Sequence, residues 1–445
     1  MAVRKRNLEV VFPHAAGIDI GGDVHYVAVP PDRCEESVRH FGCYTADLGE
    51  MADWLHACGI DTVVLESTGV YWIPVYEVLE AKGFTVYLVN ARHVKNVSGR
   101  KSDVLDCQWL QQLMHFGLLA GAFRPGGEIC ALRAVSRQRE TLIAEQARWI
   151  QRMQKALTQM NVQLSNAVTD ITGATGLAIL RAIVKGERDA ATLAKLRNYR
   201  CKKSPAELAR ALEGTWRQEH LFVLQQALAM FDVLHLRIAE ADEQLHTMLR
   251  SMERHTEKVG IDKKKGRTKN APQFDTRQAL YGLCGVDLTR IEGVDVTTAL
   301  KVLAEIGHDL SRFKTAKHFC SWLGLCPGTR ISGGKRLSGA SKRIANPVAR
   351  ALKLAALGLA RGQCATGAYY RRLAARMGAG KAITATAHKL ARTIYAMLTK
   401  KEAFCAQEQN AYEEQYRQRT VAYLKRKAAS LGFDLLPANP LSAAV

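Results

Sequence analysis

The sequence predicts a mixed α/β domain followed by a mainly α-helical region. Two observations support this fold class. Strand-like and helix-like patterns alternate over the first 125 residues, and heptad-spaced apolar residues dominate from about residue 132 onward. With 445 residues, 47% of them apolar, the chain is long enough to form two or three domains with a substantial core.

The N-terminal part is expected to begin with two antiparallel strands. Residues Ala16 to Ile20 and Val24 to Val29 are short apolar runs separated by Gly21-Gly22-Asp23, which is a hairpin signal. A third strand is expected near residues 37–42, and helices and strands alternate after it. This order fits a mixed sheet of ribonuclease-H type. The helices are expected at 48–58, 70–82 and 102–119, and the remaining strands at 62–65 and 85–89.

Two long amphipathic helices are expected in the middle of the chain. Apolar residues recur at spacings of three, four or seven from Val135 to Leu164 and again from Leu224 to Met252. A coiled-coil arm for self-association and an antiparallel hairpin within one chain fit this pattern equally well, because heptads do not specify the partner. The charged residues 185–217 between the two helices carry no recognisable chemistry.

The rest of the chain is expected to be mainly helical around a glycine-serine loop. Residues Ile291 to Gly307 resemble a helix-hairpin-helix element, in which a helix N-terminus holds a phosphate. An ordinary packing joint is the alternative, because Glu292 and Asp295 on the turn would repel phosphate. The predicted parts are an α/β domain (1–125), a helical region (126–257), a basic linker (258–275), a C-terminal domain (276–401) and a tail (402–445).

The charge distribution indicates a nucleic-acid partner. The formal net charge is +21, and the ninety-two residues from Leu310 to Lys401 contain nineteen Lys and Arg but no Asp or Glu. Such a surface attracts a polyanion, because binding releases counterions from the phosphates. No uninterrupted apolar run of about 18 residues is present, so a cytoplasmic protein without a membrane partner is expected. Eleven cysteines without CxxC spacing are expected to be reduced.

Four acidic residues of the first domain stand where a metal site would assemble. Asp19 lies inside the first apolar strand, where a lone charge is costly, and Glu66 ends a later strand. Asp103 and Asp106 are three residues apart at a helix start, so they share one face. The expected order of elements brings all four to one crevice. Clustered carboxylates repel one another unless a hard cation is present, and oxygen ligands suit Mg²⁺ or Mn²⁺.

The glycine-serine loop, residues 332–343, places hydroxyl groups among cations. Gly333 and Gly334 permit a close backbone approach to a phosphate. A serine hydroxyl hardly ionises at neutral pH, so these residues alone favour a phosphate clamp over a nucleophile. The cations that would neutralise phosphate oxygens are Lys335, Arg336, Lys342 and Arg343 in the loop and Arg350 beyond it.

Two independent sets of motifs resemble one family. Gly17 to Ile20, Leu65 to Tyr71 and Lys101 to Asp106 resemble the DEDD domain of the Piv/MooV-like transposases of the insertion-sequence 110 family. Leu323 to Lys335 and Ser341 to Asn346 look like the C-terminal transposase domain of that family, or of its 1111-like subgroup. The resemblance covers most of the chain in the right order.

This resemblance implies a DNA transposase or recombinase whose first domain is similar to Holliday-junction resolvases of RuvC type. It implies donor and target DNA as substrates, a structured noncoding guide RNA, a homodimer or homotetramer, and a bacterial, nucleoid-associated location. The nucleophile would be Ser332, which becomes covalently joined to a DNA strand, with Ser338 and Ser341 as alternatives. The ligands of Mg²⁺ or Mn²⁺ would be Asp19, Glu66, Asp103 and Asp106.

Three other functions stay open on the sequence. A RuvC-like junction nuclease would use water as the nucleophile and the serines only as phosphate clamps. Gly17 to Gly22 also resembles the phosphate loop of sugar kinases and Hsp70-like ATPases, although no second phosphate loop is visible. A non-enzymatic nucleic-acid scaffold would need neither Asp19 nor Glu66.

Overall fold

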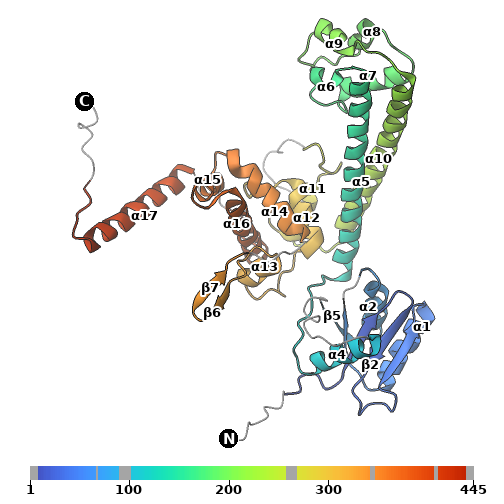
Figure 1. Cartoon of the computed structure of the whole chain (residues 1–445), viewed down its shortest axis with the longest axis vertical. Coiled ribbons are helices and arrows are strands. Elements are labelled where there is room, and N and C mark those ends of the chain that lie inside the picture. Colours follow the sequence, from blue (N-terminus) through green and yellow to red (C-terminus); the bar gives the residue numbers. More distant parts are fainter. Residues whose placement is uncertain are drawn as a thin grey trace. The chain divides into compact units, whose positions relative to one another are not determined.

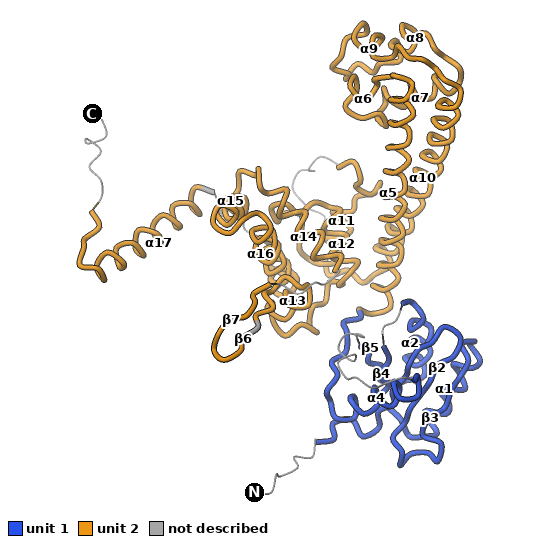
Figure 2. Tube along the Cα trace, in the orientation of Figure 1, with its two compact units in different colours: residues 1–124 blue, residues 125–445 orange. Residues whose placement is uncertain are grey.

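The chain forms two compact units, Met1–Arg124 and Pro125–Val445 (Figure 2). The computed structural model describes residues 9–66, 69–89, 102–256, 268–340, 346–404 and 409–436. The first unit is mixed α/β and the second is mainly helical, as the sequence predicts. The finer division of the second unit into a helical region, a linker, a C-terminal domain and a tail stays a prediction.

A five-stranded sheet in the order β3-β2-β1-β4-β5 forms the centre of the first unit. β1 pairs antiparallel with β2 and parallel with β4, so a hairpin is followed by parallel crossovers. This order is compatible with the ribonuclease-H type that the sequence predicts. The strands are β1 (Ala15–Ile20), β2 (Val24–Ala28), β3 (Val38–Gly42), β4 (Thr62–Glu66) and β5 (Thr85–Val89).

Helices cover both faces of this sheet. α1 (Thr45–Ala57) and α2 (Trp72–Ala81) pack on one face around the fully buried Ile18. α4 (Asp103–His115) packs on the other face around the fully buried Val64. Because side chains alternate along a strand, every second residue of β1 and β4 faces α4. Residues of β1 and β4 that face α4 are the ones positioned to meet side chains from that helix.

The second unit begins with a long helical hairpin (Figure 1). α5 (Gly127–Gln159) and α10 (Gln218–Ser251) lie side by side, and their heptad residues meet within one chain. The pairing is antiparallel, because Arg139 contacts Asp242 while Gln146 contacts Phe231. Self-association through these helices stays a prediction. The lobe beside them contains α6 (Leu164–Ala167), α7 (Ala174–Val184), α8 (Ala190–Lys195) and α9 (Pro205–Leu212).

Within the described residues, α10 alone is long and apolar enough to cross a membrane. One side of this helix belongs to the protein core: Leu224, Leu228 and Phe231 are buried against α5, α7 and neighbouring helices. A core helix of a folded protein passes the same length and composition test, so this helix is weak evidence for a membrane span.

A buried ion pair joins the two long helices. Arg139 on α5 donates through Nε to the Asp242 carboxylate on α10, and their side chains are only 7% and 3% exposed. Arg139 Nη2 also donates to the backbone oxygen of Asn270 at 3.0 Å. The second Asp242 oxygen accepts the backbone N–H of Gln273 at 2.9 Å. The ion pair therefore holds the two helices of the hairpin together. It also binds the segment from Asn270 to Gln273, which leads into the C-terminal helices.

Replacing Asp242 by Ala should lower the free energy of unfolding of the second unit by about 3–5 kcal/mol, because it leaves the buried Arg139 uncompensated. Glu240→Ala is the matched control on the same helix, since Glu240 forms an exposed pair with Arg237 and its loss should cost at most about 1 kcal/mol. Urea unfolding followed by circular dichroism at helical wavelengths measures both. Equal losses for the two variants would contradict this account of the hairpin.

The C-terminal helices pack against the base of the long hairpin. Arg137 on α5 donates through Nε and Nη2 to the two carboxylate oxygens of Glu305 on α12, at 2.7 and 2.8 Å. The helices are α11 (Thr276–Cys284), η1 (Leu288–Arg290), α12 (Val296–Ile306), α13 (Ala316–Trp322), α14 (Pro347–Gly358), η2 (Leu359–Arg361), α15 (Ala365–Met377), α16 (Ala379–Lys400) and α17 (Gln409–Ser430).

The predicted helix-hairpin-helix turn precedes α12, and both of its acidic residues are engaged within the protein. Asp295 caps α12, where its carboxylate accepts the backbone N–H of Thr298 and the hydroxyl of Thr297, each at 2.8 Å. Glu292 accepts the backbone N–H of Thr366 at 3.0 Å. A phosphate at this helix end would have to displace the Asp295 carboxylate. The phosphate-binding interpretation therefore stays unconfirmed, and these contacts fit the alternative of a packing joint.

Candidate active site

Asp19 and Glu66 lie on neighbouring parallel strands at the same level of the sheet. The register pairs Ile18 of β1 with Leu65 of β4, so the next residue of each strand is one of these two acids. Ile18 faces α1 and α2, and alternation therefore turns Asp19 and Glu66 toward α4. Asp19 is half-buried there, at the carboxyl ends of β1 and β4.

Gly17 determines how closely α4 approaches these strands. A Cβ atom at position 17 would lie 2.4 Å from the backbone oxygen of Cys107 and 2.4 Å from the backbone nitrogen of Gln111. Only glycine therefore permits the helix backbone to rest directly on β1. The first turn of α4 carries Asp103 and Asp106, and the close packing brings them to the end of β1 that holds Asp19.

The other three acids are near enough to Asp19 to affect its ionisation. Burial, followed by the negative charges of Asp103, Asp106 and Glu66, raises the pKa of Asp19 from 3.8 to about 6. Neighbouring carboxylates disfavour the ionised form of one another unless a cation neutralises them. The structure thus brings together all four of the sequence-predicted acids from β1, β4 and α4.

The donor set fits a hard divalent cation by its chemistry. All four groups offer carboxylate oxygens, the ligands that Mg²⁺ and Mn²⁺ prefer, and the raised pKa of Asp19 marks a place where positive charge is favourable. In the described conformation of these residues, no group of three or more His, Cys, Asp or Glu side chains is close enough together to hold a metal ion. Residues 67–68 and 90–101, which flank this cluster in the sequence, lie outside the described residues.

The described part of the glycine-serine loop belongs to a two-stranded hairpin. β6 (Arg330–Ser332) pairs antiparallel with β7 (Lys335–Ser338), and a two-residue turn joins them. Gly333 and Gly334 have φ angles of +53° and +73°, a backbone conformation that a residue with a Cβ rarely adopts. The sequence predicts a loop here, and the structure adds two short strands on either side of the glycine turn.

Ser332 closes this hairpin and is exposed. Its cross-strand partner is the exposed Lys335, so the hydroxyl and the ammonium group lie on the same face of the ribbon. The Ser332 hydroxyl has no hydrogen-bond partner within the described parts of the chain. Ser338, the first alternative, already accepts the backbone N–H of Ala340 at 3.3 Å and is partly buried.

Two family models match the chain over the regions that carry these sites. Residues 16–162 match a model of the DEDD domain of IS110-type proteins, described as a transposase. Residues 286–371 match a model described as transposase of the IS116/IS110/IS902 family. The chain belongs to the IS110 family of transposases. It is therefore an enzyme that acts on DNA as a transposase or recombinase. No curated protein matches the chain.

The predicted nucleic-acid contacts of the transposase lie in different places. Lys335 is exposed beside Ser332, and Arg336 is in β7. The side chain of Arg336 lies outside the part that the structure describes, as do Lys342, Arg343 and Ser341. Their roles stay predictions.

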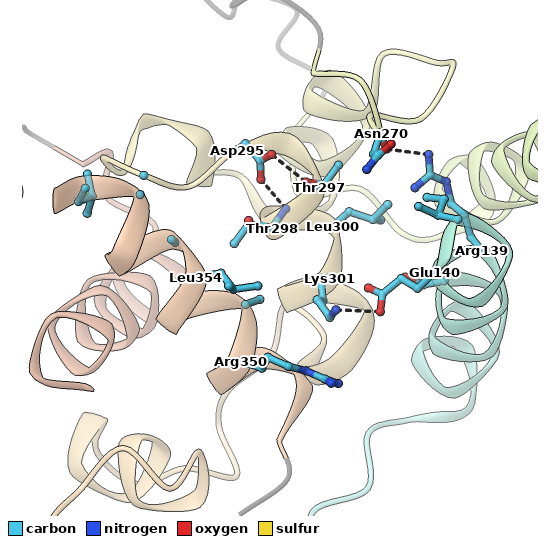
Figure 3. A pocket seen from close by; sticks show the side chains of 17 residues that line it. Arg139, Glu140, Asn270, Asp295, Thr297, Thr298, Leu300, Lys301, Arg350 and Leu354 are labelled. Carbon is cyan, nitrogen blue, oxygen red and sulfur yellow. Dashed lines mark hydrogen bonds and ion pairs between the residues drawn. The ribbon is translucent and has the colours of Figure 1, made fainter. Parts of the chain in front are cut away.

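Arg350 lines a cavity of about 830 Å³ between α5, α12 and α14 (Figure 3). Lys301 and Glu140, which also line the cavity, form an ion pair of 2.7 Å. The exposed guanidinium of Arg350 has no ion pair or hydrogen bond in the described portion of the transposase. It is thus available to an anion, as a phosphate contact requires.

Sequence reasoning missed two side chains beside the carboxylates. The register places Tyr26 of β2 directly opposite Asp19, and His40 of β3 directly opposite Tyr26. The two rings lie 6.1 Å apart between centroids. Tyr26, His40, Asp19 and Glu66 therefore form one row across the sheet on the face that α4 covers. The Gly21-Gly22-Asp23 turn is the sequence signal from which this pairing could have been predicted, because the turn of a hairpin determines which residues of its two strands lie opposite each other.

Proposed function

We propose that the transposase cuts and rejoins DNA strands of an insertion sequence through a serine nucleophile, with the help of divalent ions held by the carboxylate cluster. The observation that supports this proposal most directly is the raised pKa of Asp19, whose causes include the other three acids. An isolated buried acid would show only the effect of burial. Mutual repulsion of four carboxylates is typical of a site that functions with bound cations.

Asp19, Glu66, Asp103 and Asp106 would hold Mg²⁺ or Mn²⁺ in this proposal. When bound, such an ion supplies Lewis-acid stabilisation of charge on phosphate oxygens. The chain itself contributes the placement. Adjacent parallel strands hold Asp19 and Glu66 at one level, and the glycine contact at Gly17 holds the first turn of α4 against them. The four side chains are therefore positioned by backbone packing before any substrate binds.

Ser332 would attack a DNA phosphate through Oγ. The Oγ–phosphorus bond forms as the bond from phosphorus to the sugar oxygen of the leaving strand breaks. The serine proton passes to a base or to solvent, and the leaving oxygen takes up a proton. A hydroxyl of another strand then attacks the same phosphorus and releases the serine, so the number of phosphodiester bonds is conserved. The exposed turn and the free hydroxyl of Ser332 support this role.

Lys335 would assist this step by stabilising charge. Its ammonium group shares the ribbon face with Ser332 and faces no carboxylate within the hairpin, because residues 328–340 contain no Asp or Glu. A cation in that position stabilises negative charge that develops on the phosphate oxygens. The hairpin also contains no His, so the group that accepts the serine proton must come from elsewhere.

A metal-dependent junction nuclease is the second candidate. In that reaction water attacks the phosphate, and Ser332 and Lys335 only bind DNA. The carboxylate cluster would be used in the same way by both enzymes. A covalent protein–DNA intermediate distinguishes the two, because only the serine route forms one.

We further propose that a structured noncoding RNA guides the reaction and that a homodimer or homotetramer brings donor and target DNA together. The acid-free stretch from Leu310 to Lys401 supports a large nucleic-acid footprint, since it carries nineteen cations. Base pairing by an RNA would leave the protein to contact backbone and shape. A DNA substrate would place the transposase at the bacterial nucleoid.

Strand exchange in a purified system tests this function. The transposase is copurified with any bound RNA and mixed with DNA that carries an element junction and a target. Joined products are expected with Mg²⁺ or Mn²⁺, none with EDTA, and recovery when the ion is restored. Exchange that continues in EDTA would contradict the metal-assisted mechanism. Strand exchange that continues after complete digestion of the RNA would contradict RNA guidance but not the metal-assisted mechanism.

A further inference from the structure

The serine-bearing hairpin displays two apolar side chains to solvent. Ile331 in β6 is 67% exposed and Leu337 in β7 is 68% exposed. Ile331 directly precedes Ser332, and Leu337 follows two residues after Lys335. The proposed chemistry uses neither of them. Apolar groups this exposed are costly in water, so two on one short ribbon indicate a surface that becomes covered by a partner.

The surroundings of this pair specify the chemistry of the partner. The ribbon contains Arg330, Lys335 and Arg336 in its sequence, and no acidic residue occurs from Leu310 to Lys401. An apolar protein surface would have to desolvate these cations without neutralising them. Duplex DNA offers both kinds of contact, since apolar base faces lie between two rows of phosphates. Charge complementarity therefore favours DNA over a second protein surface.

The shape of the hairpin allows such contact close to the cut. A two-stranded ribbon fits into a DNA groove, and the two-residue glycine turn keeps its tip narrow. Adjacent strand residues are about 3.3 Å apart, similar to the rise of about 3.4 Å between stacked base pairs. Because side chains alternate along a strand, Ile331 points to the face of the ribbon opposite to Ser332 and Lys335. One face of the ribbon can therefore meet the phosphate that Ser332 attacks while the other meets the adjacent base step.

We propose that Ile331 and Leu337 act as a wedge that inserts between bases at the cleavage site and unstacks the duplex there. They are positioning residues: they do not touch the reacting atoms but give Ser332 access to a phosphate in an opened strand. This inference rests on the proposed function, because it assumes that Ser332 meets DNA. It adds a step for which the carboxylates and the serine give no explanation. In this step the base-paired DNA is opened so that Ser332 can reach the phosphate.

The test compares Ile331→Thr with Leu337→Gln on two kinds of DNA. One substrate is fully paired, and the other contains a short mismatched bubble at the cleavage step. Leu357→Gln is the matched control, because Leu357 is an exposed leucine of α14 outside the hairpin. Thr keeps the β-branched shape that suits a strand, so the hairpin should still form. Covalent adduct formation measures the reaction, and 2-aminopurine fluorescence at the step measures unstacking.

On paired DNA, each wedge variant should form adduct about 10- to 100-fold more slowly and show a reduced 2-aminopurine signal, because unstacking a base step is costly. On bubble DNA, both variants should match the unmodified transposase, and Leu357→Gln should match it on both substrates. Equal defects on paired and bubble DNA would overturn the wedge and indicate a role in protein packing. Unchanged activity on paired DNA would overturn it as well. If the unmodified transposase forms no adduct on either DNA, the proposed function itself fails.

Discussion

Asp19→Asn is expected to reduce DNA cleavage by about a thousandfold or more, because a carboxylate that holds a catalytic cation is worth several kcal/mol in the transition state. Asn keeps the shape of the side chain, and the strand should accept it. The measurement is single-turnover cleavage in Mg²⁺ and in Mn²⁺. Asp53→Asn is the control from the same unit, since Asp53 forms an exposed pair with Lys82 on the other face of the sheet.

The same Asp19→Asn variant should be more stable than the unmodified protein when divalent ions are absent. Burial and the charges of Asp103, Asp106 and Glu66 raise the folded-state pKa of Asp19 to about 6, above the unfolded value of 3.8. Between pH 3.8 and about 6, the Asp19 carboxyl is therefore protonated in the folded state but ionised in the unfolded state. The unmodified protein has its full stability with respect to this group below pH 3.8 and loses stability as the pH rises through about 6, where Asp19 ionises in the folded state.

The gain of Asp19→Asn should therefore be near zero at pH 4 and largest above pH 6. A rise of about 2–8 °C in the unfolding midpoint of the first unit is expected at pH 7 in EDTA. Adding Mg²⁺ or Mn²⁺ should stabilise the unmodified protein more than the variant, since the cation relieves the repulsion. A variant that is less stable than the unmodified protein at pH 7 in EDTA would show that the four acids do not repel one another.

Ser332→Ala should eliminate the covalent protein–DNA adduct and strand exchange, with a loss of about a thousandfold or more, because no other group would form the Oγ–phosphorus bond. Ser338→Ala is the control: its hydroxyl accepts a backbone N–H, so only a small effect is expected. Gel analysis after denaturation separates adduct from free DNA. Adduct that persists in Ser332→Ala would transfer the role of nucleophile to another residue.

Mixing the two inactive variants addresses how the site is assembled. The carboxylates belong to the first unit and Ser332 to the second. If the site combines units from two copies, Ser332→Ala and Asp19→Asn proteins should together recover part of the exchange activity. Absence of recovery at every mixing ratio would argue for a site within one chain.

The first unit was predictable because its signals are local. Alternating apolar runs identify all five strands, and the Gly21-Gly22-Asp23 turn fixes β1 and β2 as an antiparallel pair. Glu66 was recognisable at a strand end, and its level beside Asp19 follows from ordinary parallel pairing. Gly17 was visible in the sequence, but its close contact with α4 depends on the packing of elements distant in the chain.

Features of the second unit were hidden for physical reasons. β6 has only three residues, too few for a strand period to stand out from a loop, although the Gly333-Gly334 pair is a turn signal. The Arg139–Asp242 pair joins residues 103 positions apart and places charges where the heptads predict apolar side chains. The described part of the tail contains α17, and Arg372 of α15 packs on its Tyr416 ring at 3.3 Å from the ring centroid, a contact without a local sequence pattern.

The most direct test of the central claim is to identify the residue that becomes joined to DNA. The unmodified transposase is incubated with nicked substrate DNA that prevents rejoining, and the trapped adduct is digested and sequenced by mass spectrometry. A nucleotide phosphate is expected on Ser332. A phosphate on Ser338, on Ser341 or on any other side chain, or cut DNA with no protein attached, would contradict it.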